Sequence, residues 1–371
     1  MRKIYFIIGL CAFLITGCTE KVKIVEVVAD IENTISLDSV NNYLQIDSLI
    51  PVSSTNLSIA NIDKVIMNDS SVFILDKERQ VVFKVSIPTK SLQKIIDFRG
   101  KAQNEYLSIT DIAMDNSSTL YVFDSDSRKV NLYDVNGTFQ HSIPVDVGSS
   151  ISVSSTNDIG INTNQIGKNI LVVYSSSGEL RYRIPYPINV SEHVLEDLGS
   201  VVSHGDRFVY TTPFDFSIYI NQESTNDVLA EINCGINQFD VKKLKGLDYQ
   251  EYLQVLLKES RKVKMFDHLS IYDNFLFLST DRNDQLLYDM KRNKVVAISN
   301  VELPYNLLFS SPISVSKNGQ FCVVLDNTLV CDSYFSGIKH SGTKLPQLQP
   351  KSDIESTDED TIWLLMGTVQ K

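Results

Sequence analysis

Short apolar strands and polar turns alternate along most of the chain. The repeated unit is an apolar strand, a polar turn and a second alternating strand, and it is clearest in residues 71–86 (SVFILDKERQVVFKVS) and 119–134 (TLYVFDSDSRKVNLYD). Looser copies begin at Asn169, Arg207, Phe275 and Phe321. The residues that close the first strand of each copy are Asp76, Asp124, Tyr174, Thr211, Ser279 and Asp326, at spacings of 48, 50, 37, 68 and 47 residues.

A period near 45 residues with several strands per unit is typical of a β-propeller, in which each repeat forms one blade. Each strand pair is preceded by an inner strand, as in residues 63–69, and followed by an outer strand, as in residues 92–98. A four-stranded sheet cannot bury both of its faces alone, so the blades must stack around an axis. We therefore predict an all-β fold, a six-bladed propeller with four-stranded blades.

The spacing of 68 residues between the fourth and fifth copies indicates an insertion. Within it, Tyr249, Tyr252, Leu253, Leu256 and Leu257 follow helical spacing. We predict one amphipathic helix in an insert of about residues 236–263. Two roles are open for this helix: it covers one side of the propeller, or it binds a partner.

Two further apolar strands, residues 43–52 and 361–369, have no copy of their own and lie near the two ends of the propeller region. If both strands join one blade, the ring has no exposed sheet edge at its closure. We therefore expect residues 36–371 to form a propeller that is closed by strands from both termini.

The first residues have the layout of a bacterial export signal. Arg2 and Lys3 precede an uncharged apolar stretch, residues 4–15, which is shorter than the roughly 20 residues that span a bilayer. Residues 15–18 (ITGC) resemble the lipobox of bacterial lipoproteins, which implies lipidation of Cys18. An ordinary signal peptide with an incidental cysteine is the alternative.

These observations predict a lipoprotein signal peptide over residues 1–17 and a lipidated linker over residues 18–35. The expected location is the outer membrane, on either the periplasmic or the cell-surface face, with the lipid as the membrane contact. The net charge is −11, and it becomes −13 without residues 1–17, which hold two cations and no acid. A chain this acidic lacks the basic surface that nucleic acids require. DNA and RNA are therefore excluded as partners.

Residues 95–115 (IIDFRGKAQNEYLSITDIAMD) resemble a glycine-rich crossing between blades. That crossing belongs to six-bladed, TolB-like or NHL-like β-propeller lipoproteins of Gram-negative bacteria. Arg99, Gly100, Glu105 and Tyr106 match its Arg-Gly and Glu-Tyr pairs, whereas residues 101–104 replace its central Gly-Pro-Gly. The resemblance covers nearly the whole mature chain and implies the fold and the lipid anchor, but little chemistry.

Common enzyme signatures are absent from the sequence. There is no His-Glu-x-x-His, Gly-x-Ser-x-Gly, phosphate-binding glycine loop or Cys-x-x-Cys, and no cofactor is predicted. The 5 histidines are scattered without the spacing of metal ligands. Metal binding is left open.

Three aspartates, Asp76, Asp124 and Asp326, occupy equivalent places in three copies, so the symmetry of a propeller would set them in a ring. Such a ring would form a cation site or a polar rim that grips a sugar or peptide. The alternative is turn chemistry, in which each carboxylate accepts hydrogen bonds from nearby backbone N–H groups and ends a strand.

A second candidate ligand face comprises Arg99, Glu105 and Tyr106, which either contact a ligand at the channel mouth or fasten two blades together. Cys322 and Cys331 would face each other if Asp326 and Asn327 formed a two-residue hairpin loop. Their Cα atoms would then lie about 4.5–5.5 Å apart, within reach of a disulfide. Buried free thiols are the alternative.

The leading functional hypothesis is a lipid-anchored binding or protein-interaction module of the cell envelope. Its channel mouth would take a glycan, a peptide or an envelope protein. The alternative is a propeller hydrolase, lyase or lactonase with acidic residues at the channel mouth. A purely structural subunit of an envelope complex is a third hypothesis.

Overall fold

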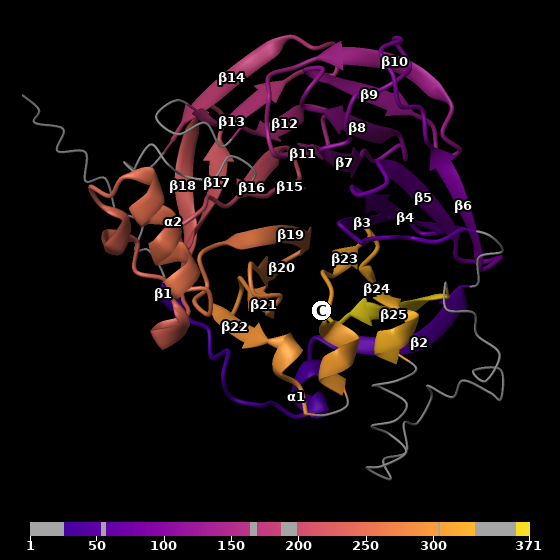
Figure 1. Ribbon diagram of the computed structural model, residues 1–371. Helices are drawn as coiled ribbons and strands as arrows, with labels where there is room; N and C mark the ends of the chain where they lie inside the picture. The colour runs from indigo at the N-terminus through magenta and orange to yellow at the C-terminus, as the bar shows by residue number, and fades with distance from the viewer. Residues whose placement is uncertain (1–25, 53–56, 164–168, 187–198, 303–304, 331–360) are drawn as a thin grey trace, which may run out of the picture.

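The computed structural model describes residues 26–52, 57–163, 169–186, 199–302, 305–330 and 361–371. Their strands form six sheets that radiate from a common axis (Figure 1). The predicted all-β, six-bladed propeller with four-stranded blades is thereby confirmed. The predicted signal peptide and Cys18 lie outside the described residues.

The first three blades follow the chain from inner to outer strand. The first consists of β3 (Lys64–Met67), β4 (Ser71–Asp76), β5 (Val81–Ser86) and β6 (Ser91–Ile96). The second consists of β7 (Asp111–Met114), β8 (Leu120–Asp124), β9 (Lys129–Tyr133) and β10 (Phe139–Pro144). The third consists of β11 (Ser150–Val153), β12 (Ile159–Asn162), β13 (Asn169–Tyr174) and β14 (Leu180–Pro185).

The other three blades include both terminal strands. The fourth has β15 (Val201–His204), β16 (Arg207–Tyr210), β17 (Ser217–Gln222) and β18 (Thr225–Asn233), with β1 (Glu26–Val28) at its outer edge. The fifth has β19 (Phe266–Tyr272), β20 (Phe275–Thr280), β21 (Gln285–Asp289) and β22 (Lys294–Ala297). The sixth has β23 (Ser314–Val315), β24 (Gln320–Asp326), β25 (Ile362–Val369) and β2 (Leu44–Val52).

Short helices lie between these strands. They are α1 (Leu37–Asn41), η1 (Gly235–Asn237), η2 (Val241–Leu244), α2 (Tyr249–Lys258), η3 (Ile298–Asn300) and η4 (Tyr305–Phe309). No helix in the described part of the chain is both long and apolar enough to cross a membrane.

The hydrophobic core is divided into layers between neighbouring blades. Alternate residues of a strand point to opposite faces of its sheet. In β4, Val72 and Ile74 pack toward the sixth blade, whereas Phe73 and Leu75 pack toward the second. Each of the six pairs of adjacent blades encloses such a cluster. Burial on both faces explains why these strands are continuously apolar.

Strands from both ends of the chain close the ring, as the sequence predicts. β25 lies between β24 and β2, and it pairs antiparallel with both. Its pairing with β2 runs from Leu44 opposite Val369 to Val52 opposite Ile362. Trp363 of β25 is fully buried in the layer between the fifth and sixth blades. The sixth blade therefore needs both chain ends.

The third blade differs from the prediction by one strand. Tyr174, expected at the end of a second strand, closes β13, which is the third strand of its blade. The second strand is β12, a segment of 4 residues that contains Gly160. A Cβ atom on Gly160 would lie 2.6 Å from the ring of Phe208 in the fourth blade. The close approach of the third and fourth blades therefore requires glycine at position 160. Because glycine has no apolar side chain, it weakens the apolar pattern of β12.

The segment before the propeller is more structured than the linker predicted for residues 18–35. β1 pairs in parallel with β18, with Val27 opposite Ile232. Further along, Ile35 forms a parallel bridge with Val301 of the fifth blade. Residues 26–35 therefore run from the fourth blade to the fifth. Sequence periodicity could not reveal this, because a strand of 3 residues carries almost no pattern.

The predicted amphipathic helix is α2, which begins at a capping box. The Asp248 carboxylate accepts hydrogen bonds from the backbone of Gln250 and Glu251, and the Glu251 side chain accepts one from Asp248 N. Tyr252 is fully buried and packs edge-on against Phe214 of the fourth blade, with ring centroids 6.4 Å apart. The helix therefore covers one side of the fourth blade.

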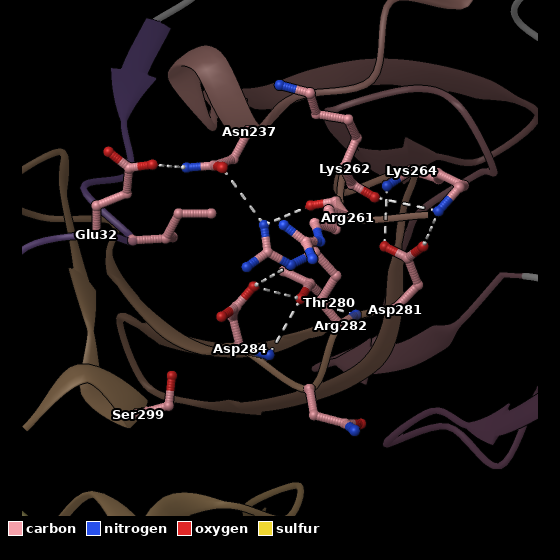
Figure 2. Close-up of polar contacts among 12 residues, drawn as sticks. Glu32, Asn237, Arg261, Lys262, Lys264, Thr280, Asp281, Arg282, Asp284 and Ser299 are labelled. Atoms are coloured by element: carbon pink, nitrogen blue, oxygen red, sulfur yellow. Dashed lines mark hydrogen bonds and ion pairs between the residues drawn. The ribbon is translucent and has the colours of Figure 1, made fainter. Parts of the chain in front are cut away.

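Figure 2 shows how polar contacts join the insert to the fifth blade. Arg282, in the turn after β20, donates to the carbonyl of Arg261 at 2.8 Å and lies 3.5 Å from Oδ1 of Asn237. Asn237 in turn donates to Glu32 at 3.0 Å. One arginine thereby holds both ends of the insert, and the N-terminal segment lies directly beside it.

Candidate functional site

A cavity of about 440 Å³ runs through the middle of the ring. Residues from all six inner strands line it: β3, β7, β11, β15, β19 and β23. Figure 1 shows these strands nearest the axis. Because every blade contributes its first strand, side chains far apart in the sequence converge on this space.

An ion pair links two blades at one end of the cavity. Lys64, at the start of β3, places its Nζ 2.6 Å from Oδ2 of Asp111 at the start of β7. The same oxygen accepts a hydrogen bond from the backbone N of Ile151 in β11, at 2.8 Å. The Asp111 side chain is 5% exposed and that of Lys64 is 21% exposed. The lysine is therefore the partner that a molecule in the cavity can reach.

His268 brings an ionisable group to the same cavity from the fifth blade. Its Nε2 lies 2.9 Å from the carbonyl oxygen of Asp63 in the first blade, and its Nδ1 lies 3.1 Å from Oδ1 of Asp267. Burial lowers the pKa of His268, but the Asp267 carboxylate and the Asp63 carbonyl outweigh this effect and raise that pKa above its ordinary value. The side chain is 35% exposed, whereas its Nδ1 atom is buried.

Serine hydroxyls supply most of the other polar groups. Of the residues that line the cavity, nine are serines, distributed over five blades, and none is Phe, Tyr or Trp. Ser150 is 7% exposed, and its hydroxyl has no hydrogen-bond partner among the described residues. Buried hydroxyls are normally paired, so this one has a free donor and acceptor beside the cavity.

The predicted ring of aspartates is not part of this cavity. Asp76 and Asp124 are fully buried at the ends of β4 and β8. The Asp76 carboxylate accepts hydrogen bonds from the backbone N of Ala60 at 2.7 Å and of Arg79 at 2.9 Å. Asp124 does the same with Leu107 and Ser127, at 2.7 and 2.9 Å. The turn-chemistry interpretation therefore describes both residues.

A further residue repeats the same arrangement in the fifth blade. Oδ1 of Asp281 accepts a hydrogen bond from the backbone N of Lys264 at 2.9 Å, and Oδ2 of Asp281 lies 3.3 Å from Nζ of Lys264 (Figure 2). Asp326, in contrast, is exposed and accepts one hydrogen bond, from Leu329 N at 2.7 Å. The carboxylates of Asp76, Asp124 and Asp281 anchor the segment that leads into a blade, and neither they nor Asp326 line the cavity.

Tyr106 fastens the loop between the first two blades to the first blade, and Arg99 and Glu105 make contacts within that loop. The Tyr106 hydroxyl is buried and donates to the carbonyl of Gln80 in the β4–β5 turn at 2.6 Å. Burial raises the pKa of this phenol far above its usual value. Arg99 donates to the carbonyl of Leu107 at 3.2 Å, and Glu105 accepts from Ala102 N at 2.8 Å. None of the three lines the cavity.

The cysteine geometry expected from a hairpin after β24 does not form. Residues 327–330 are helical, and β24 pairs with β23 and β25. Cys322 therefore faces Ser314 and Met366, and its buried thiol is free. Cys331 lies outside the described residues. The hairpin prediction was wrong because the strand that pairs with β24 comes from the end of the chain.

A family model described as a 6-bladed beta-propeller, DUF5128, matches residues 16–324. The chain belongs to this family. No curated protein matches the sequence.

Two solved structures illustrate how the DUF5128 propeller compares with others. A protein of Bacteroides fragilis NCTC 9343, described as exported, is 14% identical, with a TM-score of 0.69 over 94% of this chain and 99% of its own. A member of the DUF4221 family from Bacteroides vulgatus is 7% identical, with a TM-score of 0.53 over 88% of this chain and 98% of its own. At such identities the likeness shows the fold alone.

Sequence reasoning missed the residues that line the cavity. Lys64, Asp111, Ser150 and His268 occupy the first positions of inner strands or lie one or two residues inside them. The polar residues at the starts of these inner strands could have indicated the cavity. They were missed because the repeat was defined by the apolar second strands. Among the described residues, no group of three or more His, Cys, Asp or Glu side chains is arranged to hold a metal ion.

Proposed function

We propose that this protein is a lipid-anchored propeller of the cell envelope whose central cavity binds a small polar ligand, a glycan or a short peptide. The observation that carries the proposal is the convergence of Lys64, Asp111 and His268 with nine serines on one cavity of about 440 Å³. Ligand sites are concave, and volumes of roughly 300–1,000 Å³ suit small molecules.

Hydroxyl and charged groups give the cavity donors and acceptors in all directions. The Ser150 hydroxyl is buried without a partner among the described residues, and a ligand group would satisfy it. Lys64 supplies a cationic donor to a carboxylate or hydroxyl group of the ligand. Both ligand classes are rich in such groups, and the test below separates them.

The anchor and the location are supported by the sequence. Residues 15–18 resemble a lipobox after an export signal, and residues 95–115 resemble the blade crossings of TolB-like or NHL-like lipoproteins. The Bacteroides fragilis protein with the same fold is described as exported. We infer that Cys18 is the lipidated first residue and that the propeller is held at the outer membrane, where envelope proteins are available as partners.

His268 favours an enzyme as the second candidate. Its imidazole lies in the cavity, and contact with the Asp267 carboxylate raises its pKa. A histidine with these contacts can transfer a proton in a hydrolase or lyase reaction. The acids first considered for such a role, Asp76 and Asp124, are fully occupied by backbone hydrogen bonds.

Glycan and peptide arrays probed with the purified mature protein test the proposal. We expect retention of one ligand class and weakening of about tenfold or more in Lys64→Met, since a hydrogen bond to a charged group contributes roughly 1.5–3 kcal/mol. Ser150→Ala should weaken binding while leaving the ion pair intact. Lys84→Met is the matched control, because Lys84 lies on β5 and contacts Asn136 outside the cavity.

Retention that is equal in the wild type and both cavity variants would refute a site in the channel. If the wild type chemically converts a retained ligand and His268→Gln does not, the protein is an enzyme and the binding-module proposal is wrong. Mass spectrometry of the mature amino terminus tests the anchor separately, because a diacylglycerol on Cys18 adds a defined mass.

A further inference from the structure

The insert and the N-terminal strand share one side of the ring. Asn233 of β18 donates to Glu26 of β1 at 2.7 Å, and Asn237 of η1 donates to Glu32 at 3.0 Å (Figure 2). Figure 1 shows β1 and α2 on the same side of the ring. Cys18 is eight residues before Glu26, so it lies within about 29 Å of β1 even in a fully extended chain.

Exposed apolar side chains are concentrated on this side. Of the six large apolar side chains that are exposed in the described part of the chain, three belong to the insert and one to β1. They are Ile236 (75% exposed), Tyr249 (53%), Leu257 (76%) and Val28 (64%). Such a concentration marks an interaction surface, whereas single exposed apolar residues are ordinary.

The insert carries a net positive charge, whereas the chain as a whole is acidic. Residues 236–263 contain six Lys or Arg and four Asp or Glu, so they carry +2 in a chain of −11. Lys242, Lys245, Lys258 and Arg261 are exposed and form no ion pair among the described residues. The basic charge of the insert is therefore available to a partner.

Two contacts bring the cationic and apolar residues together at the end of the helix. The Lys262 amine donates to the carbonyl of Ile236, which holds η1 against the segment after α2. Nζ of Lys243 in η2 lies 2.6 Å from Glu259, which follows α2 directly. Ile236 and Leu257 thus lie in a region that η1, η2 and the end of α2 build jointly.

We propose that this surface lies on a bilayer that contains anionic phospholipid. Exposed apolar side chains and exposed lysines on one element are the composition that binds the interface of such a membrane. The proposal takes from the lipid anchor proposed above only that the propeller is close to a membrane. The anchored chain joins the propeller beside this surface. The propeller then meets the membrane with the side of its fourth and fifth blades, and the second contact supplements the acyl chains.

Vesicle binding of the mature chain with Cys18→Ser tests the proposal without any acyl chain. Residues 26–371 contain all six blades, so this variant keeps the complete ring. We expect sedimentation with vesicles of phosphatidylcholine and phosphatidylglycerol, loss of binding in high salt, and little binding to phosphatidylcholine alone. Lys242→Gln with Lys245→Gln should reduce partitioning about tenfold or more, because each cation near an anionic surface contributes roughly fivefold.

Apolar variants provide matched controls for the same assay. Ile236→Ser with Leu257→Ser should reduce partitioning about tenfold. Phe98→Ser with Leu180→Ser, two residues that are each 45% exposed on other blades, should leave it unchanged. Equal binding to both vesicle types, absence of binding, or equal effects of the two serine pairs would overturn the proposal. An unmodified Cys18 would refute the anchor but not this surface, because the assay contains no acyl group.

Discussion

Two kinds of ionisable side chain stand in contrast at the scale of single residues. Asp76 and Asp124 are fully buried, and in the described part of the chain their carboxylates accept hydrogen bonds from backbone N–H groups. His268 is partly exposed to the cavity and joins the first and fifth blades. Repetition in the sequence identified the first kind, because structural anchors recur in several blades, whereas a binding group need occur only once.

The titration of His268 is the prediction at this scale. The Asp267 carboxylate and the Asp63 carbonyl outweigh burial, so the pKa of His268 should exceed its ordinary value of 6.5. Burial, together with Arg207, lowers the pKa of His204 below that value. Proton NMR of the two rings should show His268 titrating at the higher pH.

Asp267→Asn should lower the pKa of His268 and leave that of His204 in place. Because the folded-state pKa of His268 is raised, its contribution to stability is complete below about pH 6.5. It is lost as pH rises through the folded-state value. Titration of His268 at a lower pH than His204 would contradict the assigned contacts.

At the scale of elements, local sequence predicted the helix and missed the strands β1 and β12. α2 was predictable because its apolar residues follow helical spacing and its capping box lies within the sequence itself. β12 was missed because it has 4 residues and a glycine required by the Phe208 ring of the next blade. When contact with a neighbouring blade determines the residues of a strand, the strand cannot be recognised from its own sequence.

Removal of the helix cap tests how independently the insert is held. Asp248→Ala deletes the side chain that accepts hydrogen bonds from Gln250 N and Glu251 N. We expect a loss of about 1 kcal/mol in local stability. Hydrogen exchange should accelerate in α2 while the blade strands stay protected. Gln250→Ala, in the same exposed turn, is the control, and equal exchange in the two variants would show that tertiary packing alone orders the helix.

At the scale of the whole molecule, stability depends on closure of the ring. Every blade buries both faces against its neighbours, so six interfaces exist only when the sixth blade is complete. β25 lies inside that blade with β2 and β24 as its partners. Loss of β25 would therefore leave two strands without their pairing partner and expose the layers on both sides.

Gly367→Val tests the closure with one substitution. A Cβ atom at Gly367 would lie 2.5 Å from the Phe321 ring and would also collide with the Gln45 carbonyl. We expect a loss of at least 1–3 kcal/mol in the free energy of unfolding, the approximate cost of overpacking a core. Urea denaturation measures it. Thr368→Ala, at the next and partly exposed position, should change stability little, and similar losses in both variants would count against the closure as the critical contact.

The sequence alone determined the blade count, the helix and the pairing of the terminal strands, because alternating apolar residues and a recurring period are properties of local segments. The export signal and the lipidation of Cys18 are also read from linear motifs, and they stay predictions of the sequence. Tertiary structure alone placed Lys64, Asp111, Ser150 and His268 around one cavity, and it placed the N-terminal segment beside the basic insert. These juxtapositions arise when the ring closes, since closure brings together first strands that lie far apart in the sequence.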